Sequence, residues 1–241
     1  MLALRLIACL LSVLLPCSSY AGPRDIQLYM PDAPPLALHG DNGHGITGDI
    51  AVMALQRAGY NAVVVNAPWA RAQKRTQESQ DIMIVPLSRT PEREAHFTWV
   101  ANIQPLHRAF FTLDNPVASL EEARQRYRLV AVGLGSAQEE ILRRSGFRDD
   151  QLYALKLGDQ PIQLVRRGRV DAWFTTELEG RHLWDAGPDL AMSALLAPLD
   201  MYIACSLQCD PQLVKAVHDA LEHMRKDGSL QRISERYVPA P

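Results

Sequence analysis

The side chains best suited to chemistry stand together in residues 86–94, "PLSRTPERE". This segment carries two hydroxyls, Ser88 and Thr90, and two guanidinium groups, Arg89 and Arg93. A guanidinium presents a planar pair of N–H donors that matches the two oxygens of a carboxylate. Thr90 also suits the N-cap of a helix, where free backbone N–H groups attract anions. The segment therefore predicts either half of a site for an anionic ligand or a capped helix whose Arg93 pairs with a nearby acid.

A second segment, "VAVGLGSAQEE", has the pattern of a strand, a glycine-containing turn and a helix start. Gly135 and Ser136 occupy the turn. A helix N-terminus attracts anions through its dipole and its unpaired N–H groups, so this turn is a candidate for the other half of the site. The alternative is a helix that is simply capped by Ser136. A dinucleotide site is disfavoured because the segment lacks G-x-G-x-x-G.

Other reactive residues give weaker signals. Cys205 and Cys209, in "ACSLQCD", predict either a disulfide across a small turn or two free thiols. The seven histidines show no metal-ligand spacing, and no nucleophile-elbow pattern is present. We expect neither a metal nor a cofactor.

These residues must be positioned by an α/β fold. Short apolar runs such as "DIMIVP", "RLVAVGL" and "DAWFTT" have the composition of buried strands. Amphipathic helical patterns alternate with them, for example "GDIAVMALQRAG" and "SAQEEILRRSG". This alternation predicts largely parallel sheets covered by helices.

Two turn-rich connections divide the chain. If both are crossovers, lobe 1 comprises residues 22–112 plus 199–241, lobe 2 comprises 116–194, and the hinge lies near 113–115 and 195–198. Two α/β lobes joined by two strands form a hinge, and the cleft between such lobes is a favoured place for a small ligand.

The N-terminus has the pattern of a signal peptide. Residues 1–21 contain a basic residue, the apolar run "LIACLLSVLLPC" and the small-residue sequence "SSYA". The alternative is an N-terminal membrane anchor. We therefore expect export to the periplasm. The formal net charge of −2 and the absence of a basic block argue against a nucleic-acid partner.

The ordered set "GITGDI", "PWARA", "DIMIVPLSRTPER", "RLVAVGLGSA", "GRVDAWFTT" and "DGSLQRISERY" resembles the periplasmic solute-binding proteins of the polar amino-acid type, extracellular solute-binding protein family 3. The resemblance covers most of the chain after the signal peptide. It implies a bilobal periplasmic-binding-protein fold. It also implies that the carboxylate of a ligand contacts Ser88, Thr90, Arg93, Gly135 and Ser136.

The sequence departs from the family where an acid is expected to bind the ligand's ammonium group. Thr176 stands at that position, and Glu177 follows it. Either Glu177 or Asp49 takes the ammonium, or the ligand is a carboxylate without one. Trp69 and Arg71, in "PWARA", are further candidate ligand contacts at the rim of the cleft.

These observations predict a monomer that binds a small carboxylate-bearing solute, an amino acid or related organic acid, for an ABC permease or a membrane sensor. One alternative is an enzyme on the same fold that resembles cyclohexadienyl dehydratases, with Glu177 as its general acid. The other is an accessory protein that acts through interactions alone.

Overall fold

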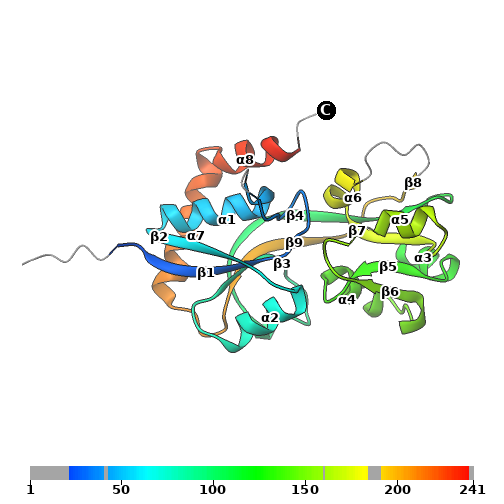
Figure 1. The fold of residues 1–241 in the computed structure, drawn as a ribbon, viewed down its shortest axis with the longest axis horizontal. Coiled ribbons are helices and arrows are strands. Elements are labelled where there is room, and N and C mark those ends of the chain that lie inside the picture. The colour runs from blue at the N-terminus through cyan, green and yellow to red at the C-terminus, as the bar shows by residue number, and fades with distance from the viewer. Residues whose placement is uncertain (1–21, 41–42, 160, 184–190, 239–241) are drawn as a thin grey trace, which may run out of the picture.

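The computed structural model describes residues 22–40, 43–159, 161–183 and 191–238. The expected signal peptide lies outside these residues. Two α/β lobes lie end to end and are joined by two long strands, β4 (Thr98–Thr112) and β9 (Leu196–Cys205) (Figure 1). The predicted bilobal α/β fold is confirmed.

The first lobe contains both chain ends of the described region. Its elements are β1 (Arg24–Met30), α1 (Gly45–Arg57), β2 (Tyr60–Asn66), α2 (Trp69–Glu78), β3 (Met83–Ser88), the 3-10 helix η1 (Glu94–His96), α7 (Pro211–Lys226) and α8 (Ser229–Tyr237). The second lobe contains α3 (Leu120–Arg126), β5 (Val130–Gly133), α4 (Ala137–Arg144), the 3-10 helix η2 (Asp149–Gln151), β6 (Leu152–Leu155), α5 (Pro161–Arg166), β7 (Ala172–Thr176), α6 (Glu177–Leu183) and β8 (Ala191–Met192).

The described strands form one sheet through both lobes, in the order β2-β1-β3-β9-β4-β7-β5-β6, with β8 on β4. In the first lobe β1 pairs parallel with β2 and β3, and in the second lobe β5 pairs parallel with β6 and β7. The connecting strands β4 and β9 pair antiparallel with each other and with their neighbours. Strand β4 pairs with β9 as far as Arg108 and with β7 from Arg108 onward. Arg108 therefore lies where the sheet passes between the lobes. The division at residues 113–115 and 195–198 remains a prediction.

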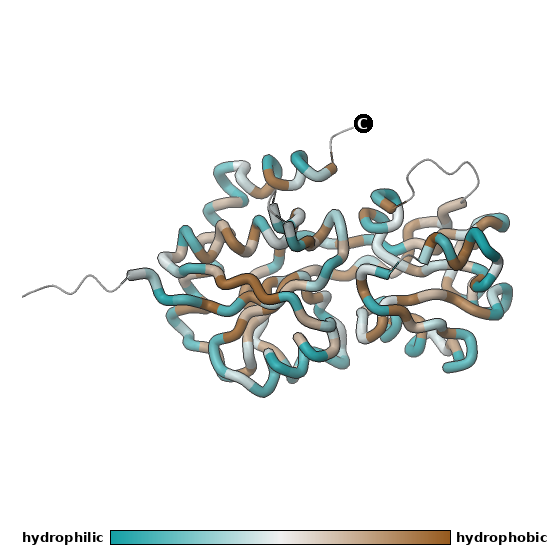
Figure 2. Tube along the Cα trace, in the orientation of Figure 1, coloured by the Kyte–Doolittle hydropathy of each residue, from teal (hydrophilic) through white to brown (hydrophobic). Residues whose placement is uncertain are grey.

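Each lobe has its own apolar core. In the first lobe α1 and α7 pack on the central strands through residues such as Leu28, Ile50 and Leu221. In the second lobe the neighbouring residues Phe110 and Phe111 enter two different clusters, because successive strand side chains point to opposite faces. Figure 2 shows the apolar strands inside and polar segments on the outer helices.

Polar side chains cap three of the helices. Ser119 and Ser136 cap α3 and α4, and Asp210 caps α7 ahead of a proline at its first position. One expectation was wrong, because Thr90 does not begin an α-helix. A turn and the short η1 follow it, and its hydroxyl donates to Glu140 instead of accepting a backbone N–H.

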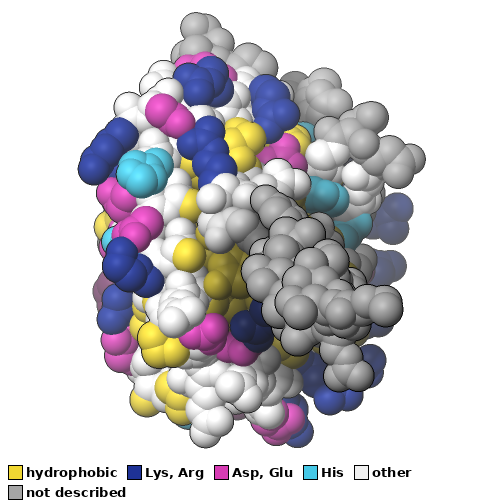
Figure 3. All heavy atoms as spheres, turned by 90° about the vertical axis from the view of Figure 1, so that its left-hand side faces the viewer, with side chains coloured by type: hydrophobic (Ala, Val, Ile, Leu, Met, Phe, Trp, Pro, Cys, Tyr) yellow, Lys and Arg dark blue, Asp and Glu magenta, His cyan; other side chains and the backbone are white. Residues whose placement is uncertain are grey.

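Cys205 and Cys209 form the predicted disulfide. No helix in the described part of the chain is both long and apolar enough to span a bilayer. The face of the first lobe seen in Figure 3 carries acidic and basic side chains side by side, without a broad field of one sign.

Close packing holds α6 against β4. A Cβ at Gly180 would lie 2.0 Å from two ring atoms of Phe111, so only glycine fits there. We expect Gly180→Ala to lower the free energy of unfolding by about 1–3 kcal/mol, because the ring or the helix must shift. Urea unfolding measures this loss. In a Phe111→Leu background the alanine should cost less, and an equal cost in both backgrounds would contradict the packing explanation.

Candidate functional site

A pocket lies between the two lobes and encloses about 470 Å³ of atom-free space, part of it open to solvent. Both lobes and the connecting strands contribute to its walls. The lining residues are Pro31, Ala33, Leu36, Trp69, Pro86, Ser88, Arg93, Leu106, Arg108, Ser136, Ala137, Gln138, Leu157, Thr176, Glu179 and Met201. The mixture of apolar walls with a few polar groups is typical of a small-molecule site.

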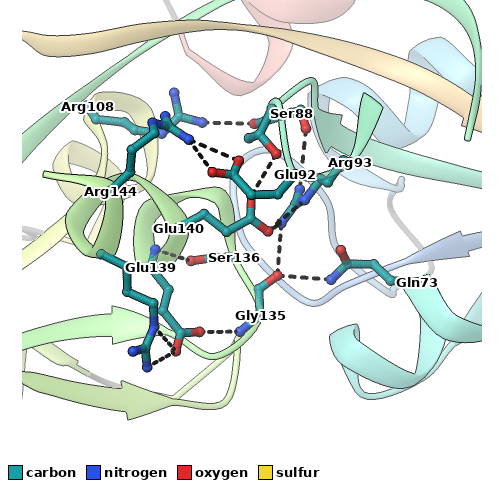
Figure 4. Close-up of polar contacts among 12 residues, drawn as sticks. Gln73, Ser88, Glu92, Arg93, Arg108, Gly135, Ser136, Glu139, Glu140 and Arg144 are labelled. Atoms are coloured by element: carbon teal, nitrogen blue, oxygen red, sulfur yellow. Dashed lines mark hydrogen bonds and ion pairs between the residues drawn. The ribbon is translucent and has the colours of Figure 1, made fainter. Parts of the chain in front are cut away.

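Arg93 is held by a carboxylate of the opposite lobe (Figure 4). Its Nε and one terminal nitrogen donate to Oε1 of Glu140 at 2.9 and 2.7 Å. Thr90 Oγ1 donates to the other oxygen, Oε2, at 2.7 Å. Burial lowers the pKa of Arg93, and the charge of Glu140 opposes this shift. Together, the hydroxyl and the guanidinium of "SRTPER" form a carboxylate clamp, and a side chain of the protein fills it.

Further contacts join the lobes around this ion pair. The carbonyl oxygen of Gly135 accepts from Arg93 at 3.0 Å and from Gln73 at 2.9 Å. Nearer the surface, Arg144 pairs with Glu92 at 2.7 Å. The second-lobe turn is therefore seated on the first lobe, and the cleft is closed.

Arg108 is a second cation on the pocket wall. Its side chain is fully buried, and one terminal nitrogen donates to Ser88 Oγ at 2.8 Å. The other terminal nitrogen donates to the carbonyls of Leu106 and Ala197 at 3.3 and 3.2 Å. Burial, followed by the charge of Arg93, lowers the pKa of Arg108 to about 10. The guanidinium therefore remains charged at neutral pH.

Glu179 is the one carboxyl among the described residues that line the pocket. It lies in the first turn of α6. Its carboxylate accepts a hydrogen bond from the Thr175 hydroxyl, and its backbone N–H donates to Thr176 Oγ1. Burial raises the pKa of Glu179 to about 7, against the opposing effect of the Thr175 hydrogen bond. Near neutral pH this group is partly protonated, so it serves as a hydrogen-bond donor or as an acceptor.

The structure brings most of the predicted site residues together. Ser88, Arg93, Ser136, Trp69 and Thr176 line the pocket. Thr90 and Gly135 lie beside them, in contact with Glu140 and Arg93 respectively. Arg71 is exposed on α2 and is absent from the pocket wall.

The two acids proposed for an ammonium group lie elsewhere. Glu177 pairs with Arg181 at 2.8 Å and is not a lining residue. Asp49 accepts from Tyr237 at 2.6 Å, pairs with Arg236 on α8, and is not a lining residue. Thr176 does line the pocket, at the end of β7.

Arg89, the other guanidinium of "PLSRTPERE", is not a lining residue of the pocket. It pairs with Glu94 at 2.5 Å and lies over the rings of Trp99 and Tyr202. Three residues that the sequence analysis did not select complete the site: Arg108, Glu140 and Glu179. Among the residues that the structure describes, no three His, Cys, Asp or Glu side chains gather as a metal site.

Comparison with known proteins gives consistent matches. The model of the bacterial extracellular solute-binding proteins, family 3, matches residues 27–240. The L-cystine-binding protein TcyJ of Escherichia coli K12 is 25% identical over 218 residues, which cover 86% of this chain and 79% of TcyJ.

Solved structures share the fold at low sequence identity. A histidine kinase sensor domain with similarity to periplasmic binding proteins superposes with a TM-score of 0.80 at 18% identity, covering 90% of this chain and 97% of the other. A mutant of the arginine-binding protein ArgBP from T. maritima gives 0.78 at 18% identity, covering 90% and 96%.

Proposed function

The chain belongs to the bacterial extracellular solute-binding proteins of family 3, and on that premise we propose that it binds a small carboxylate-bearing solute in the pocket between its lobes. The observation that carries this proposal is the Glu140 carboxylate on Thr90 and Arg93. It supports the proposal because these buried donors already bind one carboxylate, that of Glu140. The proposal includes an amino acid or a related organic acid as the ligand.

We propose further that closure of the lobes on the solute presents the protein to an ABC permease or a membrane sensor. The protein would act as a monomer in the periplasm after removal of residues 1–21. Two connecting strands allow a hinge motion, and a solute shifts the equilibrium toward the closed form only if it binds that form more tightly.

A panel of carboxylates tests the binding proposal by thermal shift. The panel contains L-glutamine, L-arginine, L-cystine, propionate and succinate, each at increasing concentration. At a hundredfold excess over its Kd, a ligand of the native state stabilises it by about 2.7 kcal/mol, which is about 5–10 °C for a chain of this size. The matched controls are L-argininamide and propionamide, which lack the carboxylate. Equal stabilisation by the amides, or none by any acid, would contradict the proposal.

One observation favours a second candidate, the dehydratase-like enzyme. Such an elimination needs an acid within the pocket, and Glu177 is not there. Glu179 is there, with a pKa of about 7 that suits a general acid. Incubation of the purified protein with prephenate distinguishes the two functions. Product formed by the wild type and not by Glu179→Gln would establish the enzyme. Thermal stabilisation by prephenate without product would favour binding.

A further inference from the structure

Two buried guanidinium groups meet at Ser88, and only one of them has an ion-pair partner among the described residues. Arg93 contacts the Ser88 carbonyl at 3.4 Å and Arg108 contacts the Ser88 hydroxyl at 2.8 Å, so two guanidinium groups converge on one residue. Glu140 supplies a carboxylate to Arg93. Of the two guanidinium groups, only Arg93 has a carboxylate at ion-pair distance among the described residues, although the charge of Glu140 also raises the pKa of Arg108.

Arg108 is the guanidinium without an ion-pair partner. Among the residues that the structure describes, no carboxylate lies within ion-pair distance of Arg108, and its contacts are two carbonyls and one hydroxyl. Its Nε is buried without any hydrogen-bond partner. A buried charge that is unpaired is strongly unfavourable, so a guanidinium in this condition on a pocket wall is a strong candidate to receive an anion.

The pocket confines that anion to a small organic group. Leu106 and Met201 line it together with Arg108, and both are buried and apolar. Trp69, from α2, adds an aromatic surface. A ligand with one carboxylate and a short apolar or neutral body matches both the charge and the walls.

We propose that Arg108, with Ser88, is the subsite that receives the carboxylate of the solute, while Glu140 stays on Arg93. This inference rests on the proposed binding of a carboxylate solute and names the residue that holds it. The closed cleft then contains two carboxylates on two guanidinium groups, one from the protein and one from the solute. A solute with one carboxylate supplies the single ion-pair partner that Arg108 lacks.

Calorimetric titration with propionate, succinate and L-glutamine tests this assignment in the full-length mature chain. Arg108→Gln should weaken binding of every carboxylate that binds the wild type by about thirtyfold or more, because truncating one partner of a buried charge pair is costly. Arg108→Lys retains the positive charge without the planar pair of donors, so its affinity should lie between those of the wild type and Arg108→Gln. The matched control is Arg89→Gln, since Arg89 pairs with Glu94 outside the pocket.

A spectroscopic readout protects the test against misfolding of the variants. In ¹H–¹⁵N spectra the Nε–H of Arg108 is assigned by its loss in Arg108→Lys. Propionate should move this signal downfield in the wild-type protein, and propionamide should not.

The outcomes separate the two proposals. If no panel compound binds the wild type, the proposed function fails and the subsite fails with it. A second result would overturn the subsite alone. In that result a carboxylate binds the wild type, Arg108→Gln keeps the wild-type affinity, and Arg93→Gln loses it. The solute would then displace Glu140 from Arg93. An unmoved Nε–H signal at saturating propionate would overturn it equally.

Discussion

As the pH rises from 5 to 8, the free energy of unfolding of the wild type should fall relative to that of Glu179→Gln. Burial raises the folded-state pKa of Glu179 to about 7, above the ordinary value of 4.5. The folded state therefore holds its proton more tightly than the unfolded state does. The stability from this group is fully present below pH 4.5 and is lost as the pH rises through 7. The difference in pKa corresponds to about 3 kcal/mol of unfolding free energy.

Urea unfolding at pH 5, 6, 7 and 8 measures this effect. The glutamine variant keeps a neutral side chain of the same shape, so the difference between wild type and variant removes the contributions of other titrating groups. At pH 8 the variant should be the more stable protein. Glu177→Gln is the matched control, because Glu177 lies in the same helix and pairs with Arg181 outside the pocket. Parallel pH profiles for wild type and Glu179→Gln would show that Glu179 is ionised throughout.

The overall architecture was predictable because its signals are local. Alternating apolar runs and amphipathic patterns give strands and helices, and Ser119, Ser136 and Asp210 mark helix starts by side-chain hydrogen bonds within three residues. The carboxylate-binding character of Arg93 was also predictable, since it follows from the chemistry of the guanidinium. Thr90 was wrongly expected to cap an α-helix because its actual partner comes from the other lobe.

The partners across the cleft were not predictable from local patterns. Glu140 is 47 residues from Arg93 in sequence, and the two meet only because α4 closes onto the loop after β3. Glu179 is buried in the first turn of α6, next to Gly180, which packs against Phe111, and such close packing leaves no periodic signal. Arg108 did offer a signal, since it is a lone charge in the apolar run "PLHRAFFTL". A charge in a buried strand calls for a partner.

Replacement of Glu140 by glutamine should open the protein in the absence of solute. The pair between Arg93 and Glu140 is largely buried, with 5% and 23% of the two side chains exposed. Removal of one partner of a buried pair costs about 3–5 kcal/mol because the remaining charge is uncompensated. Opening of the cleft returns Arg93 to water and avoids this cost. Small-angle X-ray scattering should therefore record a larger radius of gyration for Glu140→Gln.

The matched control is Glu92→Gln, which breaks the other ion pair between the lobes. Glu92 and Arg144 are each 44% exposed, and exposed pairs contribute little. This variant should keep the wild-type radius of gyration. If the radius of gyration rises equally in both variants, the two ion pairs hold the lobes together equally, and the buried Glu140 carboxylate has no special role.

Loss of the Glu140 charge should also change which acids the cleft prefers. In the wild type Arg93 has a carboxylate partner and Arg108 has none among the described residues, whereas in Glu140→Gln neither guanidinium has one. A dicarboxylate such as succinate can then neutralise both Arg93 and Arg108, which contact the same Ser88. Calorimetry should show the ratio of succinate to propionate affinity rising by about tenfold or more, in line with coupling energies of buried charge pairs. An unchanged ratio would mean that Arg93 stays closed to the solute even without Glu140.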